Sequence, residues 1–469
     1  MQIQTDIRHQ VQQVMERAVG LGASFAEVFV EVNVQDEIRF ESQQIDQIRG
    51  GTELGVGVRV VKNSQTAYSI VNTLDTAVLL TLVENAMAGL HQGTGITRSS
   101  ATKGHIEGQV YHQLCDEPLP KVNYLQVGQE LAAIDTNARK ASAWIQQVAI
   151  QFLSHRRQIL VANSKGVWQN EVRSFTRVNA QAVANRRGFV QTGVNNVALT
   201  VDEARLFERY PAAALGEQVG NTATILLDAI PTPTGILPIV VSNGRGGVLV
   251  HEACVHCLEA DYISRENSVY NGRLGQMVAK PIVTIIDDGT MPDLPGTSVI
   301  DDEGCPTQYN VLVEKGRLQS YLTDRMYAKQ LDYHLTGNGR RQSYAFLPMP
   351  RMTNTYVAPG EDTPEEIIAE TSYGIYARRV SGGQVNPVTG EFVFTVTEGY
   401  LIEDGQLTKP LITFTLTGNG PGILQNIDRV AHDFELAAVM CGKNGQFVPV
   451  SVGQPTIRVQ GLVVGGTRR

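Results

Sequence analysis

The feature that most constrains the fold of this chain is a long alternation of apolar and polar residues near its N-terminus. In the stretch AEVFVEVNVQDEIRFESQQIDQIRGG, residues 26–51, apolar side chains recur at every second position over several segments. The segments GVGVRVV and TAYSIV continue the pattern to residue 71. A period of two places apolar side chains on one face of a β-strand. The pattern therefore predicts several adjacent strands with one buried face.

Helical periodicity surrounds these strands. Between residues 5 and 21, apolar side chains recur at helical spacing and two glycines follow, which predicts a helix with a defined end. The same reasoning predicts helices at 75–91, 122–140 and near 202–215, and alternating strands from Trp144 to Leu199. Mixed helices and strands of this kind predict an α/β unit in the first half of the chain.

The second half of the chain has a different sequence pattern, with clustered prolines and with glycine turns between short alternating runs. Three prolines fall within eight residues of the segment DAIPTPTGILPIVVSNG, which predicts a domain boundary near residue 225. Beyond it, VLVEKGRLQSYL and GYLIEDGQLTKPL each place a glycine turn between alternating runs, as hairpins do. We therefore expect an α+β protein of two domains: an N-terminal α/β domain, 1–225, and a C-terminal β-rich domain, 226–469.

Length and composition exclude several classes of protein. A chain of 469 residues is too long for one ordinary core, which agrees with two domains. A net charge of -8 gives no reason to expect a nucleic-acid partner. No apolar run reaches the ~20 residues of a membrane helix, and the polar N-terminus lacks a signal sequence, so we expect a cytoplasmic protein without a membrane partner. Five scattered cysteines, Cys115 among them, indicate reduced thiols.

The stretch GGVLVHEACVHCLEAD, residues 246–261, carries the chemistry. Two histidines, two cysteines and three acids fall between His251 and Asp261. Zinc prefers nitrogen and sulfur ligands in a tetrahedral array, and a catalytic site leaves one position for water. His251 and His256 could supply two nitrogens. Glu252 directly follows the first histidine, as the general base does in His-Glu-x-x-His proteases.

The spacing of the two histidines is unusual, because His251 and His256 are five residues apart rather than four. On a regular helix, residues five apart diverge by about 140°, whereas residues four apart diverge by about 40°. The spacing therefore requires a local distortion such as a π-bulge, or a helix end at the site. Without either, the two histidines would be ordinary buried side chains of a core helix.

The third ligand is left open by the pattern alone. The candidates are Cys254, Cys257, Glu259, Cys305, His334, His432 and Cys441. Cys254 and Cys257 are also well suited to core packing, and Glu259 and Asp261 to a helix end or the surface. Arg378 and Arg379 could hold a substrate carboxylate, but a solvated pair is the simpler interpretation.

At this point the residues resemble a known family. The motif GGVLVHEACVHCLEAD, the tail MCGKNGQFVPVSVGQPTIRVQGLVVGGT and the N-terminal strand pattern together resemble the TldD/PmbA metallopeptidases over nearly the whole chain. The resemblance implies that His251, His256 and Cys441 bind Zn²⁺ and that Glu252 is the catalytic acid/base. Two positions differ from the family pattern, since Val255 and Cys257 flank His256 where glycines are usual.

The resemblance also implies a function and a partner. It implies a zinc-dependent peptidase that hydrolyses unfolded or short peptides, in peptide maturation or small-protein degradation, and that binds its substrate as an extended chain. It implies a homodimer, or a heterodimer with a PmbA (TldE)-like paralogue. The alternative is a non-catalytic peptide-binding or regulatory subunit, for which loss of His251, Glu252 or His256 would have been expected.

Overall fold

A six-stranded sheet dominates the N-terminal half of the protein. The computed structural model describes residues 2–91 and 121–466, so Cys115 lies outside the described residues. The strand order is β3-β2-β1-β4-β5-β6, and every pairing is antiparallel. The strands are β1 (Phe25–Glu41), β2 (Gln44–Lys62), β3 (Gln65–Val71), β4 (Ile145–Asn163), β5 (Trp168–Arg186) and β6 (Phe189–Leu199). The alternating pattern of the N-terminal sequence is thus confirmed as neighbouring strands.

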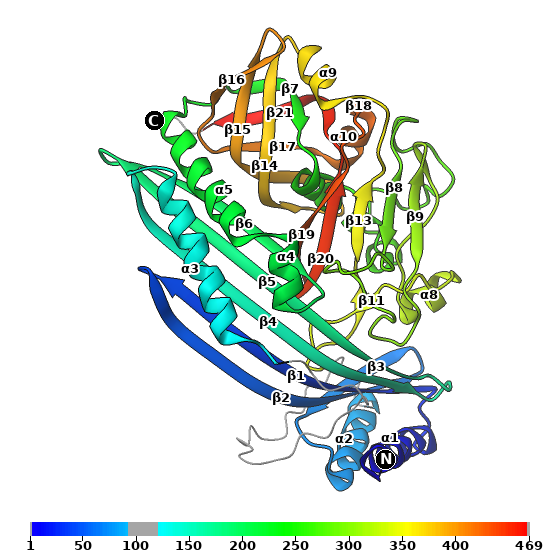
Figure 1. Ribbon diagram of the computed structural model, residues 1–469. Helices are drawn as coiled ribbons and strands as arrows, with labels where there is room; N and C mark the ends of the chain where they lie inside the picture. The colour runs from blue at the N-terminus through cyan, green and yellow to red at the C-terminus, as the bar shows by residue number, and fades with distance from the viewer. Residues whose placement is uncertain (1, 92–120, 467–469) are drawn as a thin grey trace.

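Helices cover one face of this sheet (Figure 1). Toward one end, α1 (Gln2–Gly20) and α2 (Thr76–His91) pack on valines such as Val28 and Val58. Toward the other end, α3 (Tyr124–Lys140) and α5 (Ala212–Ile225) pack on Ile38 and its neighbours. The even-numbered residues of β1 therefore face the helices. The odd-numbered residues, including Phe29, face the C-terminal half, where Phe29 shares a cluster with Ile300.

One predicted helix is divided in two. The helix expected near 202–215 is α4 (Glu203–Arg209) followed by α5, with Pro211 between them. A proline disfavours the helical conformation of the residue before it. Tyr210 accordingly has φ -127° and ψ 82°, which ends α4 and lets α5 start in a new direction. A boundary near residue 225, where α5 ends, stays a proposal.

The C-terminal half is built from two larger sheets and a two-stranded ribbon, β11 (Gly339–Arg340) with β12 (Met349–Pro350). One sheet has the order β10-β9-β8-β13-β20-β19, with strands β8 (Ile285–Asp288), β9 (Tyr309–Glu314), β10 (Arg317–Leu318), β13 (Asn354–Val357), β19 (Glu435–Lys443) and β20 (Gln446–Gln454). The other has the order β14-β7-β21-β17-β15-β16, with strands β7 (Gly235–Val241), β14 (Tyr373–Val385), β15 (Glu391–Glu403), β16 (Gln406–Pro410), β17 (Phe414–Asn419) and β21 (Ile457–Gly466); β18 (Ile427–Val430) pairs with β21. The predicted α+β class with a β-rich second half is confirmed.

Both predicted hairpins form. Lys315 and Gly316 connect β9 to β10, and Asp404 and Gly405 connect β15 to β16. All four residues have positive φ, between 43° and 82°. Two consecutive residues with positive φ match the twist of the adjoining strands, and glycine adopts that conformation without a steric penalty.

Short helices and 3-10 turns connect the strands of the C-terminal half. They are α6 (Val248–Ala253), α7 (Ala260–Ile263), α8 (Arg325–Leu331), α9 (Pro364–Ala369), α10 (Gly420–Asn426) and the 3-10 turns η1 (Leu226–Asp228), η2 (Gly244–Gly247) and η3 (Val255–Leu258). Residues of α6 and η3 belong to the largest apolar cluster of the described chain, together with β20 and β21. No helix in the described ranges is long and apolar enough to cross a membrane.

Buried ion pairs join the two halves. Arg341 is fully buried and its Nη2 lies 2.7 Å from Oε1 of Glu27 on β1. Arg59 on β2 donates to Glu27 at 2.9 Å and to Glu303 at 2.6 Å. The odd face of the first sheet is therefore tied to the C-terminal half by charges that are removed from solvent.

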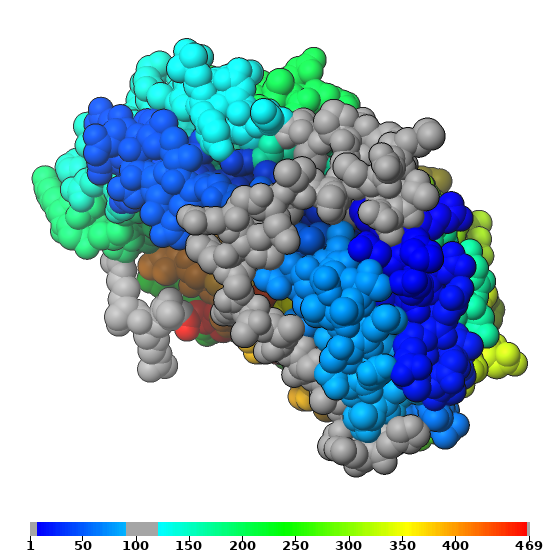
Figure 2. Space-filling view, turned by 90° about the horizontal axis from the view of Figure 1, so that it is seen from below, coloured from blue at the N-terminus to red at the C-terminus, as the bar shows by residue number. Residues whose placement is uncertain are grey.

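Seen from below, helices α1 and α2 lie on the outer surface (Figure 2).

Candidate metal centre

The motif residues occupy two short helical segments, and not the single distorted helix that a π-bulge would give. α6 ends at Ala253, Cys254 leaves the helical conformation with φ -122° and ψ -54°, and η3 begins at Val255. This is the second of the two possibilities that the spacing allows, a helix end at the site. The break rotates His256 back toward His251, and their ring centroids lie 5.1 Å apart.

Three side chains predicted to bind metal meet at this break. The Nε2 atoms of His251 and His256 each lie 3.2 Å from Sγ of Cys441, which comes from β19. One ligand atom from each of the three residues lies within 4.8 Å of the other two. All three side chains are buried. Within the described part of the chain, this is the only group of three or more such residues with ligand atoms this close together.

The donor set fits zinc. Zinc binds imidazole nitrogen at about 2.0–2.1 Å and thiolate sulfur at about 2.3 Å in tetrahedral geometry, which separates a nitrogen from a sulfur ligand by about 3.5 Å. The observed separations of 3.2 Å need only a small adjustment. Two nitrogens and one sulfur also leave a fourth tetrahedral position for water or substrate, as in catalytic zinc sites.

The charges around Cys441 favour its thiolate form. Burial alone would raise the pKa of its thiol, but the adjacent His256 and His251 outweigh burial and hold the pKa well below the usual value. Burial likewise opposes the charged form of His256. The charges of Cys441, Glu259 and Glu252 nevertheless raise the pKa of His256 well above its usual value. The site is therefore negative enough to hold a cation, whether a proton or a metal ion.

Glu252 lies beside the three donor residues without being one of them. Its Oε2 lies 3.5 Å from Nε2 of His256, the nitrogen that faces Cys441. About a fifth of the Glu252 side chain is exposed to solvent, whereas His256 is almost completely enclosed. A carboxylate at the open side of a metal centre can accept a proton from water bound there.

Two acids of the motif lie at a helix end, as one of the two sequence interpretations expected: Glu259 is the N-cap of α7, and Asp261 is in its first turn. The other interpretation, a surface position, is wrong, because both side chains are buried. Glu259 accepts from Nδ1 of His256 at 2.9 Å and from Nζ of Lys443 at 2.9 Å, and Asp261 accepts from Lys443 at 2.6 Å. Burial would raise the pKa of Glu259, but Lys443 and His256 lower it to about 2.

The carboxylate of Glu259 therefore fixes the ring of His256 so that Nε2 points at Cys441, which is how neighbouring carboxylates orient metal-binding histidines. Lys443 had no role in the sequence analysis. Its position two residues after Cys441 was the available signal, because residues two apart on a strand share a face.

The remaining candidate ligands lie elsewhere. Cys254 and Cys257 are buried in the apolar cluster, where burial raises both thiol pKa values, that of Cys257 to about 12. Their sulfurs face the backbone oxygens of Gly420 and Ala253. Val255 is also fully buried in this cluster. Cys305 lies beside Pro306 O, His334 stacks on Tyr333, and His432 contacts the backbone of Asp362.

Comparison with known proteins agrees with this fold and identifies the family. Family models match in three parts: PmbA/TldA metallopeptidase domain 1 at residues 26–89, the central domain at 117–227 and the C-terminal domain at 234–466. The chain is 34% identical to a protein of Haemophilus influenzae named "Metalloprotease TldD homolog", covering 94% of this chain and 93% of that one. It is 26% identical to a "Zinc metalloprotease TldD homolog" of Saccharolobus solfataricus, covering 96% and 99%.

Among solved structures, TldE from Thermococcus kodakarensis has the same fold, with a TM-score of 0.75, 18% identity and coverage of 97% of this chain and 100% of that one. The three matched domains and the full-length relatives lead to one assignment. The chain belongs to the PmbA/TldD family of metallopeptidases.

Proposed function

We propose that this protein is a zinc-dependent peptidase in which His251, His256 and Cys441 hold the metal and Glu252 transfers protons. The observation that carries the proposal is the convergence of two imidazoles and one thiolate around a point that Glu252 can also reach. Zinc is favoured over magnesium or calcium because the donors are nitrogen and sulfur, whereas those ions prefer oxygen.

Each residue of the proposed site has its own role in hydrolysis. Bound zinc would lower the pKa of a coordinated water and polarise the scissile carbonyl. Glu252 would accept a proton from the attacking water and pass it to the leaving amine. Glu259 keeps His256 in the orientation that faces Cys441, and Lys443 neutralises the charge of Glu259. About a fifth of the Glu252 side chain is exposed, which gives the proton an exchange route to solvent.

We propose an unfolded or short peptide as the substrate. Cys441 lies on β19, which is the edge strand of its sheet. An extended peptide can pair with an edge strand through backbone hydrogen bonds and so present its peptide bonds without a requirement for a particular sequence. The structural likeness to TldE supports, as a further part of the proposal, pairing with a second copy or a TldE-like paralogue.

Replacement of Glu252 by glutamine tests the enzymatic proposal. Gln keeps the shape but cannot accept the water proton, so Glu252→Gln should lower the hydrolysis rate of an unstructured peptide by at least about 100-fold. Because Glu252 is not a ligand, zinc content measured by atomic emission should equal that of the parent. Glu361→Gln, a change of the same kind at an exposed position, is the matched control. Parental activity in Glu252→Gln would overturn the assignment, and zinc without activity in the parent would favour the non-catalytic subunit.

A further inference from the structure

Two adjoining cavities lie where α5 and β6 of the first half meet β14, β15 and β19 of the second. Their volumes are about 430 and 470 Å³. Three side chains, Arg245, Arg379 and Glu398, line both cavities, so the two spaces meet at these residues. Figure 1 shows α5 and β6 on one side and β14 and β15 on the other. We call the joined space the arginine cleft.

The arginine cleft is positively charged in a protein whose net charge is -8. Four arginines line it and two glutamates, Glu398 and Glu435, oppose them. The arginines are Arg209, Arg245, Arg378 and Arg379. Of these, Arg378 is already neutralised, because its Nε lies 3.2 Å from the buried carboxylate of Glu398.

Arg245 and Arg379 have neutral partners instead. Among the described residues, neither forms an ion pair with a carboxylate. Arg379 donates to Oδ1 of Asn195 at 3.1 Å, and Arg245 donates to Oδ1 of Asn196 and to the backbone oxygen of Val380. The two amides are themselves fixed, because Nδ2 of Asn195 donates to Gln218 and Nδ2 of Asn196 to Ala438 O. The asparagines thus position the two guanidinium groups without cancelling their charge.

This arrangement is unfavourable for the empty protein. Burial lowers the pKa of Arg245. The pKa of Arg379 is lowered to about 10, first by burial and then by the positive charge of Arg245. Arginine stays charged at neutral pH all the same, so the cleft holds two partly buried cations near one another. Buried charges are normally paired, and a planar guanidinium pairs best with the two oxygens of a carboxylate or phosphate.

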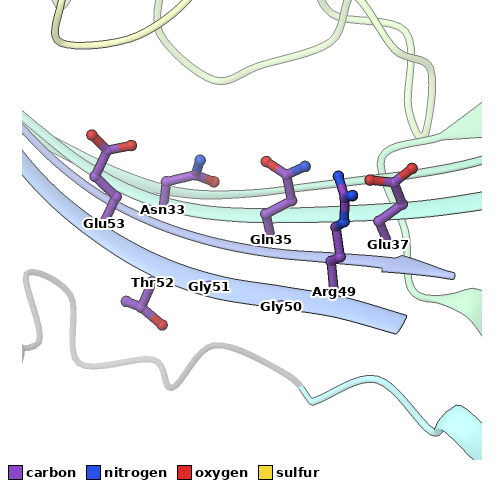
Figure 3. Close-up of a pocket in the computed structure, with 8 residues that line it drawn as sticks. All are labelled: Asn33, Gln35, Glu37, Arg49, Gly50, Gly51, Thr52 and Glu53. Carbon is purple, nitrogen blue, oxygen red and sulfur yellow. The ribbon is translucent and has the colours of Figure 1, made fainter. Parts of the chain in front are cut away.

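In another cavity of the protein, the lining includes carboxylates as well as an arginine. It lies on the odd face of the first sheet and contains one arginine, Arg49 (Figure 3). Arg49 stands directly opposite Glu37 across the strand pair, and Glu53 lines the same cavity. Arg49 is exposed and the carboxylate of Glu37 lies beside it, so nothing there calls for an anionic ligand.

We propose that the arginine cleft is an oxyanion-binding site in which Arg245 and Arg379 hold the carboxylate or phosphate group of a small ligand. The site is separate from the three residues proposed to bind metal but is connected to them: β19 lines the cleft and carries Cys441, and Arg245 lies on η2, which leads directly into α6. Its ligand is either a free phosphate compound or the terminal carboxylate of a peptide. Binding there does not depend on hydrolysis, so it stands or falls independently of the proposed peptidase activity.

Isothermal titration calorimetry on chelator-treated and metal-loaded protein tests the site. The probes are inorganic phosphate, acetyl-trialanine with a free carboxylate and the corresponding amide. We expect at least one of the two anions to bind both forms of the protein, and the amide not to bind. Arg245→Gln and Arg379→Gln should each weaken binding at least tenfold, whereas Arg49→Gln removes an exposed arginine and should leave it unchanged. Circular dichroism checks folding, and Arg379→Lys, which keeps the charge but loses the planar fork, should bind with intermediate affinity.

The outcomes are distinct. Binding of phosphate alone or of the peptide acid alone supports the site and identifies the source of its oxyanion. The proposal is overturned if neither anion binds, if affinity is unchanged in both Arg245→Gln and Arg379→Gln, or if binding disappears when the metal is removed, since the anion would then lie on the metal.

Discussion

Cys441 is the residue on which the proposed metal centre most depends, because its sulfur lies 3.2 Å from Nε2 of both histidines. Cys441→Ala removes one of three donors and should weaken zinc binding by more than the about 10- to 100-fold that loss of a hydrogen-bonded neighbour of a ligand costs. Cys254→Ala and Cys257→Ala should keep their zinc and lose only about 1 kcal/mol each of folding stability through packing. Zinc content of the three variants, measured side by side, decides the matter.

Two results would contradict this assignment. Full zinc occupancy in Cys441→Ala would remove it from the ligand set. Loss of zinc in Cys257→Ala alone would show that this cysteine, which stands where the family usually has glycine, has taken over as ligand.

Glu259 should act on the metal through His256. Glu259→Gln replaces the carboxylate that holds Nδ1 of His256 and leaves Lys443 with Asp261 as its remaining acidic partner. We expect zinc affinity, measured by competition with a chelator, to fall by about 10- to 100-fold. Glu361→Gln should change nothing. An unchanged affinity in Glu259→Gln would mean that packing alone orients His256.

At the scale of single residues, the sequence identified the side chains that can bind a metal, but not the side chains that contact them. His251, Glu252 and His256 offer the donor types of a zinc peptidase, although their spacing alone also fits ordinary side chains of a core helix, and it was the resemblance to a family that decided between the two. Glu259 could not be assigned, because its burial depends on Lys443, which is 184 residues away in the sequence. A charge that is neutralised only by a distant segment looks like any surface charge in the linear sequence.

The end of α6 is the element-scale feature that makes the site possible, and α10 supports it from the side. A Cβ at Gly420, the first residue of α10, would lie 1.9 Å from the carbonyl oxygen of Ala253, the last residue of α6. Gly420→Ala must therefore displace one of these helices. We expect a loss of about 1–3 kcal/mol in folding stability and weaker zinc binding, since the displaced end of α6 leads into His256.

Gly422→Ala provides the matched control for that prediction. Gly422 is on the same helix, but a Cβ there would meet nothing closer than 4.0 Å. It should be neutral or stabilise the protein by up to about 1 kcal/mol, because alanine favours the helix. Thermal unfolding and zinc titration of both variants make the comparison. Equal behaviour of the two would show that α10 does not restrain α6.

Elements with a regular period were predictable, and elements set by tertiary contacts were not. The strands and helices up to α3 follow from alternation and helical spacing, and the two hairpins follow from their glycine turns. The division of α4 from α5 depends on Pro211, whose effect a broad helical pattern conceals. The break at Cys254 has no local signal of its own; the five-residue spacing of the histidines was what indicated it.

At the scale of the whole molecule, the two halves meet through buried charges that respond to pH. Asp301 lies among them. Burial, and then the charge of Glu303, raise the pKa of Asp301 to about 7. In the unfolded chain an aspartate has a pKa of about 3.9. Between these values the folded state holds a proton that the unfolded state has released, so the contribution of Asp301 to stability is lost as the pH rises through that window.

Glu303→Gln should therefore destabilise the protein less at pH 8 than at pH 5. At both values the change removes one of the two acidic partners of Arg59. At pH 8 it also relieves the repulsion between two ionised carboxylates, whereas at pH 5 that repulsion is already reduced by the proton on Asp301. Denaturant unfolding of parent and variant at the two pH values gives the comparison. A larger loss at pH 8 would contradict this account.

The separation of the metal donors along the chain has a consequence for synthesis. His251 and Cys441 are 190 residues apart. At about 5–20 residues per second, a ribosome would add Cys441 about 10–40 s after His251. During that interval the nascent protein carries the histidines but cannot complete the centre. The proposed peptidase centre is therefore incomplete until most of the chain has been synthesised, and hydrolysis by that centre cannot begin while the earlier segments are still emerging.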